Sequence, residues 1–287
     1  ADIKLSAGRA YEIGRREAVT LCGFWVLTAV LFGLLTGHML GYERMIEFFT
    51  GYVIEYSLSM DNMFVFVMIF AYFGVPKKYQ PKILTWGIIG AVIMRMILIF
   101  AGVGLIKAFA WIIYVFGAIL IYTAFKMYFQ KDEEMDPGAN PVLKLLAKAM
   151  PIDKDDRSGN FFARKEVLYA TPLFATLLVI ETSDLIFAVD SIPAVLAISK
   201  EAFIVYTSNV FAVVGLRSLY FLLASLLDLF RFLKTGISVI LFYVGCKMLL
   251  SDFVHIPAIL SLGVVLGILA LSMLLSVVIK PPQPAAK

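Results

Sequence analysis

Three carboxylate side chains lie inside a stretch of sequence that is otherwise as apolar as a membrane span. Glu181, Asp184 and Asp190 occur within ETSDLIFAVDS, residues 181–191. A charged side chain at the centre of a transmembrane helix costs about 2.5 to 3.5 kcal/mol on insertion scales, so such a residue needs a partner and by default marks a functional site. The partners predicted here are cationic: a metal ion, protons or basic side chains.

Another acidic segment lies nearer the N-terminus. EYSLSMDN, residues 55–62, again places acids and an amide among apolar residues, with serines between them. Carboxylate, amide and hydroxyl groups offer only oxygen, which suits hard divalent cations such as Mn²⁺, Mg²⁺ or Ca²⁺ and disfavours Zn²⁺ and copper. The predicted metal ligands are Glu55, Asp61, Asn62, Glu181, Asp184 and Asp190, supported by Ser57, Ser59, Ser183, Ser191, Arg95 and Arg217.

Two arginines lie near the middle of predicted spans, too deep to reach the membrane surface easily. We hypothesise that Arg95 and Arg217 hold the carboxylates apart when no metal is bound, and that metal competes with protons for the acids. The alternative is that acids and arginines only stabilise the helix bundle through buried ion pairs. Asn209 is expected to form a hydrogen bond between helices.

The two acidic segments belong to an apparent internal duplication. When Asp61 is aligned with Asp184, Arg95 falls within one residue of Arg217. Further along, GAILIYTAFKM (117–127) aligns with SVILFYVGCKM (238–248). Chance similarity between apolar helices is the alternative, but the near-constant offset of intramembrane charges favours two copies of one unit.

The composition is that of a membrane protein. The chain has 287 residues, 61% of them hydrophobic, with a mean hydropathy of +0.89, and its charge is concentrated between apolar runs. We predict an all-α, polytopic transmembrane bundle in one membrane domain, 1–287, in contact with the lipid bilayer and with no nucleic-acid partner. Two isolated cysteines suggest neither a disulfide framework nor a thiolate metal site. Apolar runs predict eight spans: 18–37, 52–74, 83–106, 108–129, 167–199, 203–228, 235–251 and 257–279.

The basic residues predict the topology. Alternate connections carry 19 Lys and Arg on one side and 4 on the other, which places both observed termini in the cytoplasm. The expected location is the inner membrane of a bacterium. Two three-helix repeats, 45–129 and 166–251, then run in opposite senses. A cytoplasmic linker, 130–165, joins them and contains a short surface helix at PVLKLLAKAM, and the last span, 257–279, follows the second repeat.

Two local expectations concern helix shape. Pro193 removes one backbone hydrogen bond, and the fifth span is too long for one straight crossing, so we predict a helix break near Asp190. The segment before the second span is expected to be an interfacial amphipathic helix whose acids, Glu43 and Glu47, face water.

The sequence resembles the TerC family of integral membrane proteins, named for tellurite resistance and including Alx-type manganese exporters. The resemblance covers residues 8–279 and is carried by EYSLSMDN, FGVPKKYQ, WGIIGAVIMR, ETSDLIFAVDSIPAVLAIS and YTSNVFAVVGLRSLYFLL. It implies a fold similar to lysine-exporter-like transporters and Mn²⁺ efflux, with the motif acids as the functional residues: Glu55, Asp61, Glu181, Asp184 and Asp190. Family members usually carry a further hydrophobic helix, with its own acidic residue, before AGRAYEIGRREAV; this chain begins after it and is expected to be either a fragment or a natural short form.

The predicted function is therefore export of a divalent cation, most simply Mn²⁺, with protons as a second partner. Two other interpretations stay open: a membrane scaffold that assembles with other membrane proteins, and an exporter of another solute such as an amino acid. No nucleophile with an adjacent base is visible, so an enzyme is not expected.

Overall fold

The computed structural model describes residues 13–109, 111–129, 140–153, 159–164, 168–223, 232–254 and 256–278, and these form long helices with one short hairpin. The elements are α2 (Arg15–Leu40), α3 (Tyr42–Tyr72), η1 (Lys77–Tyr79), α4 (Gln80–Ala108), α5 (Ile112–Phe129), α6 (Pro141–Ala149), β1 (Phe162–Arg164), β2 (Leu168–Ala170), α7 (Pro172–Leu196), α8 (Ala202–Leu223), α9 (Leu233–Leu249) and α10 (Ala258–Val278).

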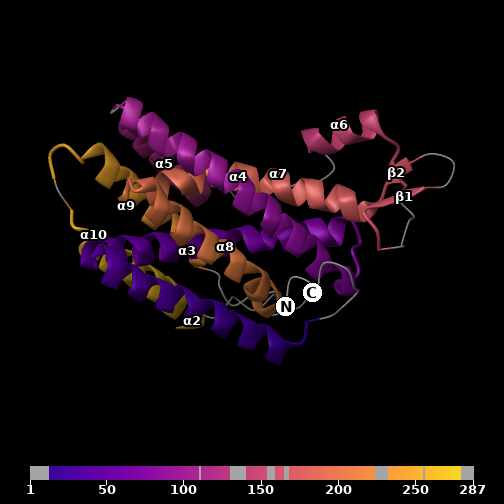
Figure 1. Cartoon of the computed structure of the whole chain (residues 1–287), viewed down its shortest axis with the longest axis horizontal. Helices are drawn as coiled ribbons and strands as arrows, with labels where there is room; N and C mark the ends of the chain where they lie inside the picture. Colours follow the sequence, from indigo (N-terminus) through magenta and orange to yellow (C-terminus); the bar gives the residue numbers. More distant parts are fainter. Residues whose placement is uncertain are drawn as a thin grey trace, which may run out of the picture.

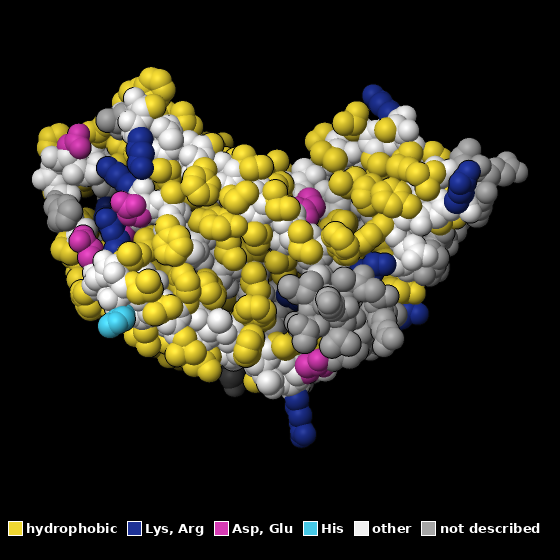
Figure 2. Space-filling model, in the orientation of Figure 1, with side chains coloured by type: hydrophobic (Ala, Val, Ile, Leu, Met, Phe, Trp, Pro, Cys, Tyr) yellow, Lys and Arg dark blue, Asp and Glu magenta, His cyan; other side chains and the backbone are white. Residues whose placement is uncertain are grey.

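Each of the eight predicted spans contains one long helix, which confirms the all-α membrane fold; 224–228 of the predicted span 203–228 lie outside the described residues. In the described ranges, seven helices are long and apolar enough to cross a membrane, and the eighth, α9, has 17 residues. Large apolar side chains point outward along them, among them Leu31 on α2 and Leu274 on α10. On the face shown in Figure 2, hydrophobic side chains cover the middle of the bundle and most charged side chains lie toward its edges. This distribution fits lipid around the middle and water at the ends.

Local sequence sets several helix boundaries. Gly41 separates α2 from α3 with a φ of 97°, a conformation that favours glycine. Pro172 opens α7, where its missing N–H would have no helical partner. Asn140 caps the predicted short helix α6, because its side-chain oxygen accepts a hydrogen bond from the amide of Val142 at 2.9 Å.

The predicted break near Asp190 is wrong. α7 runs without interruption from Pro172 to Leu196, through Pro193. The span is also shorter than 167–199, because 168–170 form β2, which pairs antiparallel with β1. At 25 residues the helix is about 38 Å long, enough for one crossing. Packed neighbours commonly stabilise a proline inside such a helix.

The amphipathic lead-in is not a separate element either. It is the first part of α3, a continuous helix of 31 residues. Glu43 is exposed as predicted. Glu47 was expected to face water, but it is 8% exposed, because the α7–α8 turn covers it: Ser199 donates a hydrogen bond to Glu47 at 2.7 Å.

The segments that connect the helices contact one another at two opposite ends of the bundle, in the grouping that the charge pattern predicted. At one end, Lys82 at the start of α4 donates to the carbonyl of Gly159 at 3.0 Å. At the other, Arg44 pairs with Glu201 at 3.6 Å, and Tyr114 hydrogen-bonds Asp252. Figure 1 shows the hairpin and α6 at one end of the bundle and the turn after α9 at the other.

The long helices interlock. α3 packs on α7 and α8, α4 packs on the same two helices, and α5 packs on α9 (Figure 1). α2 lies against α3 and α8, and α10 against α3 and α9. Most buried apolar residues of α3, α4 and α7 belong to two large clusters, one toward each end of the bundle, and a small third cluster contains Tyr52 of α3. The charged network described below lies between the two clusters.

α5 and α9 cross at two glycines. A methyl group added at Gly117 would lie 3.0 Å from the carbonyl oxygen of Gly245, and one added at Gly245 would lie 2.9 Å from the carbonyl oxygen of Gly117. Small residues of this kind let transmembrane helices approach closely.

We therefore predict that Gly117→Ala lowers the free energy of unfolding by about 1–3 kcal/mol, because the added methyl must push backbone apart. Detergent titration of the purified protein in mixed micelles measures it. The control is Gly104→Ala on α4, where an added methyl meets no atom within 4 Å. This control should be neutral or slightly stabilising, since alanine favours helix. Equal unfolding midpoints for the two variants would contradict the crossing.

Candidate functional site

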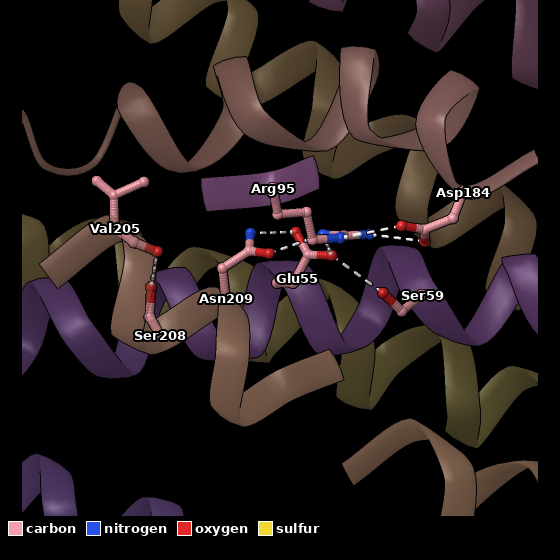
Figure 3. A network of polar contacts seen from close by, with 7 residues as sticks. All are labelled: Glu55, Ser59, Arg95, Asp184, Val205, Ser208 and Asn209. Carbon is pink, nitrogen blue, oxygen red and sulfur yellow. Dashed lines mark hydrogen bonds and ion pairs between the residues drawn. The ribbon is translucent and has the colours of Figure 1, made fainter. Parts of the chain in front are cut away.

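Arg95 is the centre of a buried charged network that joins four helices. Its side chain is 1% exposed, and it lies one residue from the middle of the 29-residue α4. The guanidinium contacts Glu55 of α3, Asp184 of α7 and Asn209 of α8. Figure 3 shows these side chains converging from four helices. A guanidinium at this depth is compatible with folding only because anionic and polar groups surround it.

Asp184 binds Arg95 through both of its carboxylate oxygens. Arg95 Nη2 donates to Oδ1 at 3.0 Å, and Nε donates to Oδ2 at 3.3 Å. This bidentate geometry is the strongest form of a carboxylate–arginine pair. Asp184 is also the central residue of α7 and is 6% exposed.

Glu55 has the most complete set of partners. Its Oε1 accepts from Arg95 Nη1 and, at 3.1 Å, from the hydroxyl of Ser59 one turn further along α3. Its Oε2 accepts from the amide of Asn209 at 2.9 Å, and the carbonyl of the same amide accepts from Arg95 at 2.8 Å. Asn209 therefore bridges the acid and the arginine, and its predicted role as a hydrogen-bonding residue between helices is confirmed.

Glu181 lies beside this network, one helical turn before Asp184 on α7. Its carboxylate rests against Gly90 of α4, where any added Cβ atom would overlap it. Glu181, Asp184 and Arg217 all line a cavity of about 30 Å³ between α3, α4, α7 and α8. That volume is enough for a water molecule or a small ion. Arg217 is 6% exposed.

The predicted supporting serines behave differently from one another. Ser59 joins the acid network. Ser57 and Ser183 instead donate to carbonyl oxygens of their own helices, those of Val53 and Val179. Ser191 is 3% exposed, and no partner for its hydroxyl is found in the described part of the chain.

The remaining predicted ligands are not placed in the network. Asn62 lies on α3 and is 9% exposed. The backbones of Asp61 and Asp190 lie within α3 and α7, but their side chains fall outside the described part. Among the side chains that are described, no group of three Asp, Glu, His or Cys could hold a metal ion. In the described state Arg95, a cation of the protein itself, lies between Glu55 and Asp184.

A second polar cluster, at one end of the bundle, was not predicted from the sequence. Arg44 donates to both oxygens of Glu47 at 2.9 and 2.7 Å, and Ser199 donates to the same carboxylate. A signal was available: Glu47, Gly51, Glu55 and Ser59 recur every four residues, which places them along one side of α3. Their spacing extends the charged face of this helix from its middle to its end.

Comparison with known proteins adds a family match over most of the chain. Residues 40–283 match the Integral membrane protein TerC family. No solved structure matches the chain.

Close relatives are bacterial. A protein of Salmonella typhi named "Putative membrane-bound redox modulator Alx" is 42% identical over 285 residues, covering 96% of this chain and 88% of the relative. The protein of the same name in Escherichia coli strain K12 is also 42% identical, covering 96% and 89%. An uncharacterized membrane protein of Myxococcus xanthus, STKORF319, is 41% identical over 281 residues, covering 96% and 87%.

Proposed function

Because the chain belongs to the TerC family of integral membrane proteins, we propose that it is a transporter that exports a divalent metal cation, with Mn²⁺ as the substrate. The observation that carries the proposal is the buried network of Glu55, Arg95, Asp184 and Asn209 in the middle of the bundle. Ionisable groups at this depth mark ion pathways in membrane proteins.

The network has the composition of an exchangeable cation site. Three described acids, Glu55, Glu181 and Asp184, lie in or beside it, and Arg95 neutralises only part of their charge. A hard divalent cation would find carboxylate and amide oxygens there. In the proposed cycle the incoming metal displaces Arg95 from Asp184, and protons occupy the acids when the metal has left.

The arrangement of helices supports two related halves. If α3, α4 and α5 correspond to α7, α8 and α9, a twofold relation exchanges the α3–α8 contact with the α4–α7 contact and keeps α5 paired with α9. These contacts all occur. The network would then take Glu55 and Arg95 from one repeat and Asp184 and Asn209 from the other. A site between inverted repeats can be exposed to each side in turn when one repeat moves against the other.

Location and direction complete the proposal. The bacterial relatives and the excess of Lys and Arg at one end favour the plasma membrane with both observed termini in the cytoplasm. Export as the direction of transport rests on the family resemblance alone, and no enzymatic activity is proposed.

The direct test is Mn²⁺ flux into liposomes containing the purified protein, with a metal-sensitive dye and a pH dye inside. We expect flux by the unmodified chain and opposite movement of protons. Glu55→Gln should abolish both, because the amide keeps the shape but loses the charge. Absence of flux from the folded, unmodified chain, or equal flux by Glu55→Gln, would contradict the proposal.

Gly90 gives a more local prediction. Gly90→Ala should raise the Mn²⁺ concentration for half-maximal flux by about 10-fold, because the methyl displaces the flexible Glu181 carboxylate without moving backbone. Protein abundance should stay normal. Gly104→Ala on the same helix, in open space, should leave the flux unchanged. An unchanged Mn²⁺ dependence in Gly90→Ala would mean that Glu181 takes no part in binding.

The relatives' name suggests redox modulation as a second candidate. A thiol mechanism would use the only two cysteines, Cys22 and Cys246, which are both free and lie on α2 and α9. Replacing both by serine should leave Mn²⁺ flux intact under our proposal. Loss of flux in the folded double variant would favour the redox candidate.

A further inference from the structure

A second cavity lies next to the one that contains the acids. It has a volume of about 50 Å³ and is bounded by α2, α4 and α8, with Trp25, Thr85 and Ser218 among its walls. The first cavity, about 30 Å³, contains Glu181 and Asp184. Each is large enough to hold water, and each is lined by polar as well as apolar groups.

Among the described residues, only Arg217 and Ile88 line both cavities. They come from α8 and α4, so they form the partition between the cavities. Ile88 is neutral and apolar. Arg217 carries a permanent positive charge, so its side of the partition is the one that attracts anions and repels cations.

The second cavity lies toward one end of the bundle. Thr85 belongs to the beginning of α4, and Ser218 to the last part of α8. The positive-inside prediction assigns this end to the cytoplasm. The opposite end is fastened by the Arg44–Glu47–Ser199 contacts. Ile13, which precedes α2, lines the second cavity and not the first, so the second cavity reaches nearer to this end of the bundle.

We infer that the space between α2, α4 and α8 is the cytoplasmic entry route to the acids, and that Arg217 is the barrier within it. This inference rests on the proposed function, because an entry route presupposes a transported cation. Arg217 lines both cavities, and its positive charge repels cations that pass between them. A divalent cation reaches Asp184 only when Arg217 moves aside, toward the acids and away from the incoming ion, so Arg217 would limit both the rate of entry and the charge of what enters.

The test measures access to the first cavity and does not require transport. Cys22 and Cys246 are replaced by serine, and Ala91→Cys places a thiol in the wall of the first cavity, where Ala91 is buried. Vesicles are treated with Ag⁺ from the cytoplasmic side for increasing times. The thiols that remain are then counted with a maleimide after denaturation.

With Arg217 in place, the thiol of Ala91→Cys should react slowly. Arg217→Met, which keeps the bulk but removes the charge, should accelerate its reaction with Ag⁺ by at least about 10-fold. The reaction with neutral methyl methanethiosulfonate should change little. Arg217→Ala, which also opens the partition, should accelerate both reagents, and Arg217→Lys should accelerate neither. Leu21→Cys, in the wall of the second cavity, is the control and should react readily in every background.

The barrier, the entry route and the proposed function would each be contradicted by a different result. Fast reaction of Ala91→Cys in the presence of Arg217, or rates unaffected by both Arg217→Met and Arg217→Ala, would overturn the barrier. Equal Ag⁺ rates from the two sides of the membrane would overturn the entry route. If the rates behave as expected but the protein carries no Mn²⁺, the proposed function fails and the barrier stands.

Discussion

Arg95→Met should lower the free energy of unfolding by about 3–5 kcal/mol, because it leaves two buried carboxylates without their cation. Glu55 and Asp184 are 0% and 6% exposed, so water cannot replace the guanidinium. Methionine fills much of the volume of the arginine stem, which limits the effect of an added cavity. Detergent titration of the purified protein in mixed micelles measures the loss.

The matched control removes the charges together. Arg95→Met combined with Glu55→Gln and Asp184→Asn should recover most of the lost stability, because neutral groups that can still form hydrogen bonds replace the whole set of ions. The new amide at position 55 can still hydrogen-bond Asn209 and Ser59, the neutral partners of Glu55. A triple variant as unstable as Arg95→Met would mean that packing around the arginine, and not its charge, stabilises the bundle.

The same triple variant separates transport from a scaffold role. If the acids only hold the bundle together, a stable neutral variant should keep any association with other membrane proteins and any cellular function. Under the transport proposal it should fold, insert into the membrane and carry no Mn²⁺. Retained function with the charges removed would favour the scaffold.

The membrane helices and their ends were predictable from the sequence because membrane insertion depends on local composition. Each of the eight apolar runs contains one long helix, and contacts such as Lys82–Gly159 and Arg44–Glu201 join the connections predicted to share an end. Both properties follow from the bilayer, which requires long apolar helices and leaves charges at the surface.

Helix packing was much less predictable. The need of Arg95 for acidic partners was evident from its depth, but the choice of Glu55 and Asp184 depends on how α4 is rotated and shifted against α3 and α7. The burial of Glu47 likewise depends on where the α7–α8 turn comes to rest. The expected break at Pro193 failed for a similar reason, since neighbours of a helix decide whether a proline interrupts it.

Asp184→Asn should reduce Mn²⁺ flux by at least about 100-fold while the protein remains folded and abundant. Asparagine keeps the size of the side chain and can still accept a hydrogen bond from Arg95, so the structural change is small. It cannot supply the charge that a divalent cation needs in order to displace the guanidinium. Liposome flux and the amount of folded protein should be measured on the same preparations.

Asp252→Asn is the control of identical chemistry at an exposed position. Asp252 lies in the turn after α9, where it hydrogen-bonds Tyr114, far along the chain from the network. The control variant should keep Mn²⁺ flux within about 2-fold of the unmodified protein, because an exposed contact of this kind contributes little. Lowering the pH should inhibit flux by the unmodified protein, since protons compete with metal for the same carboxylates. An equal loss of Mn²⁺ flux in Asp184→Asn and Asp252→Asn would mean that a general change in charge causes the effect, and that Asp184 is not part of the binding site.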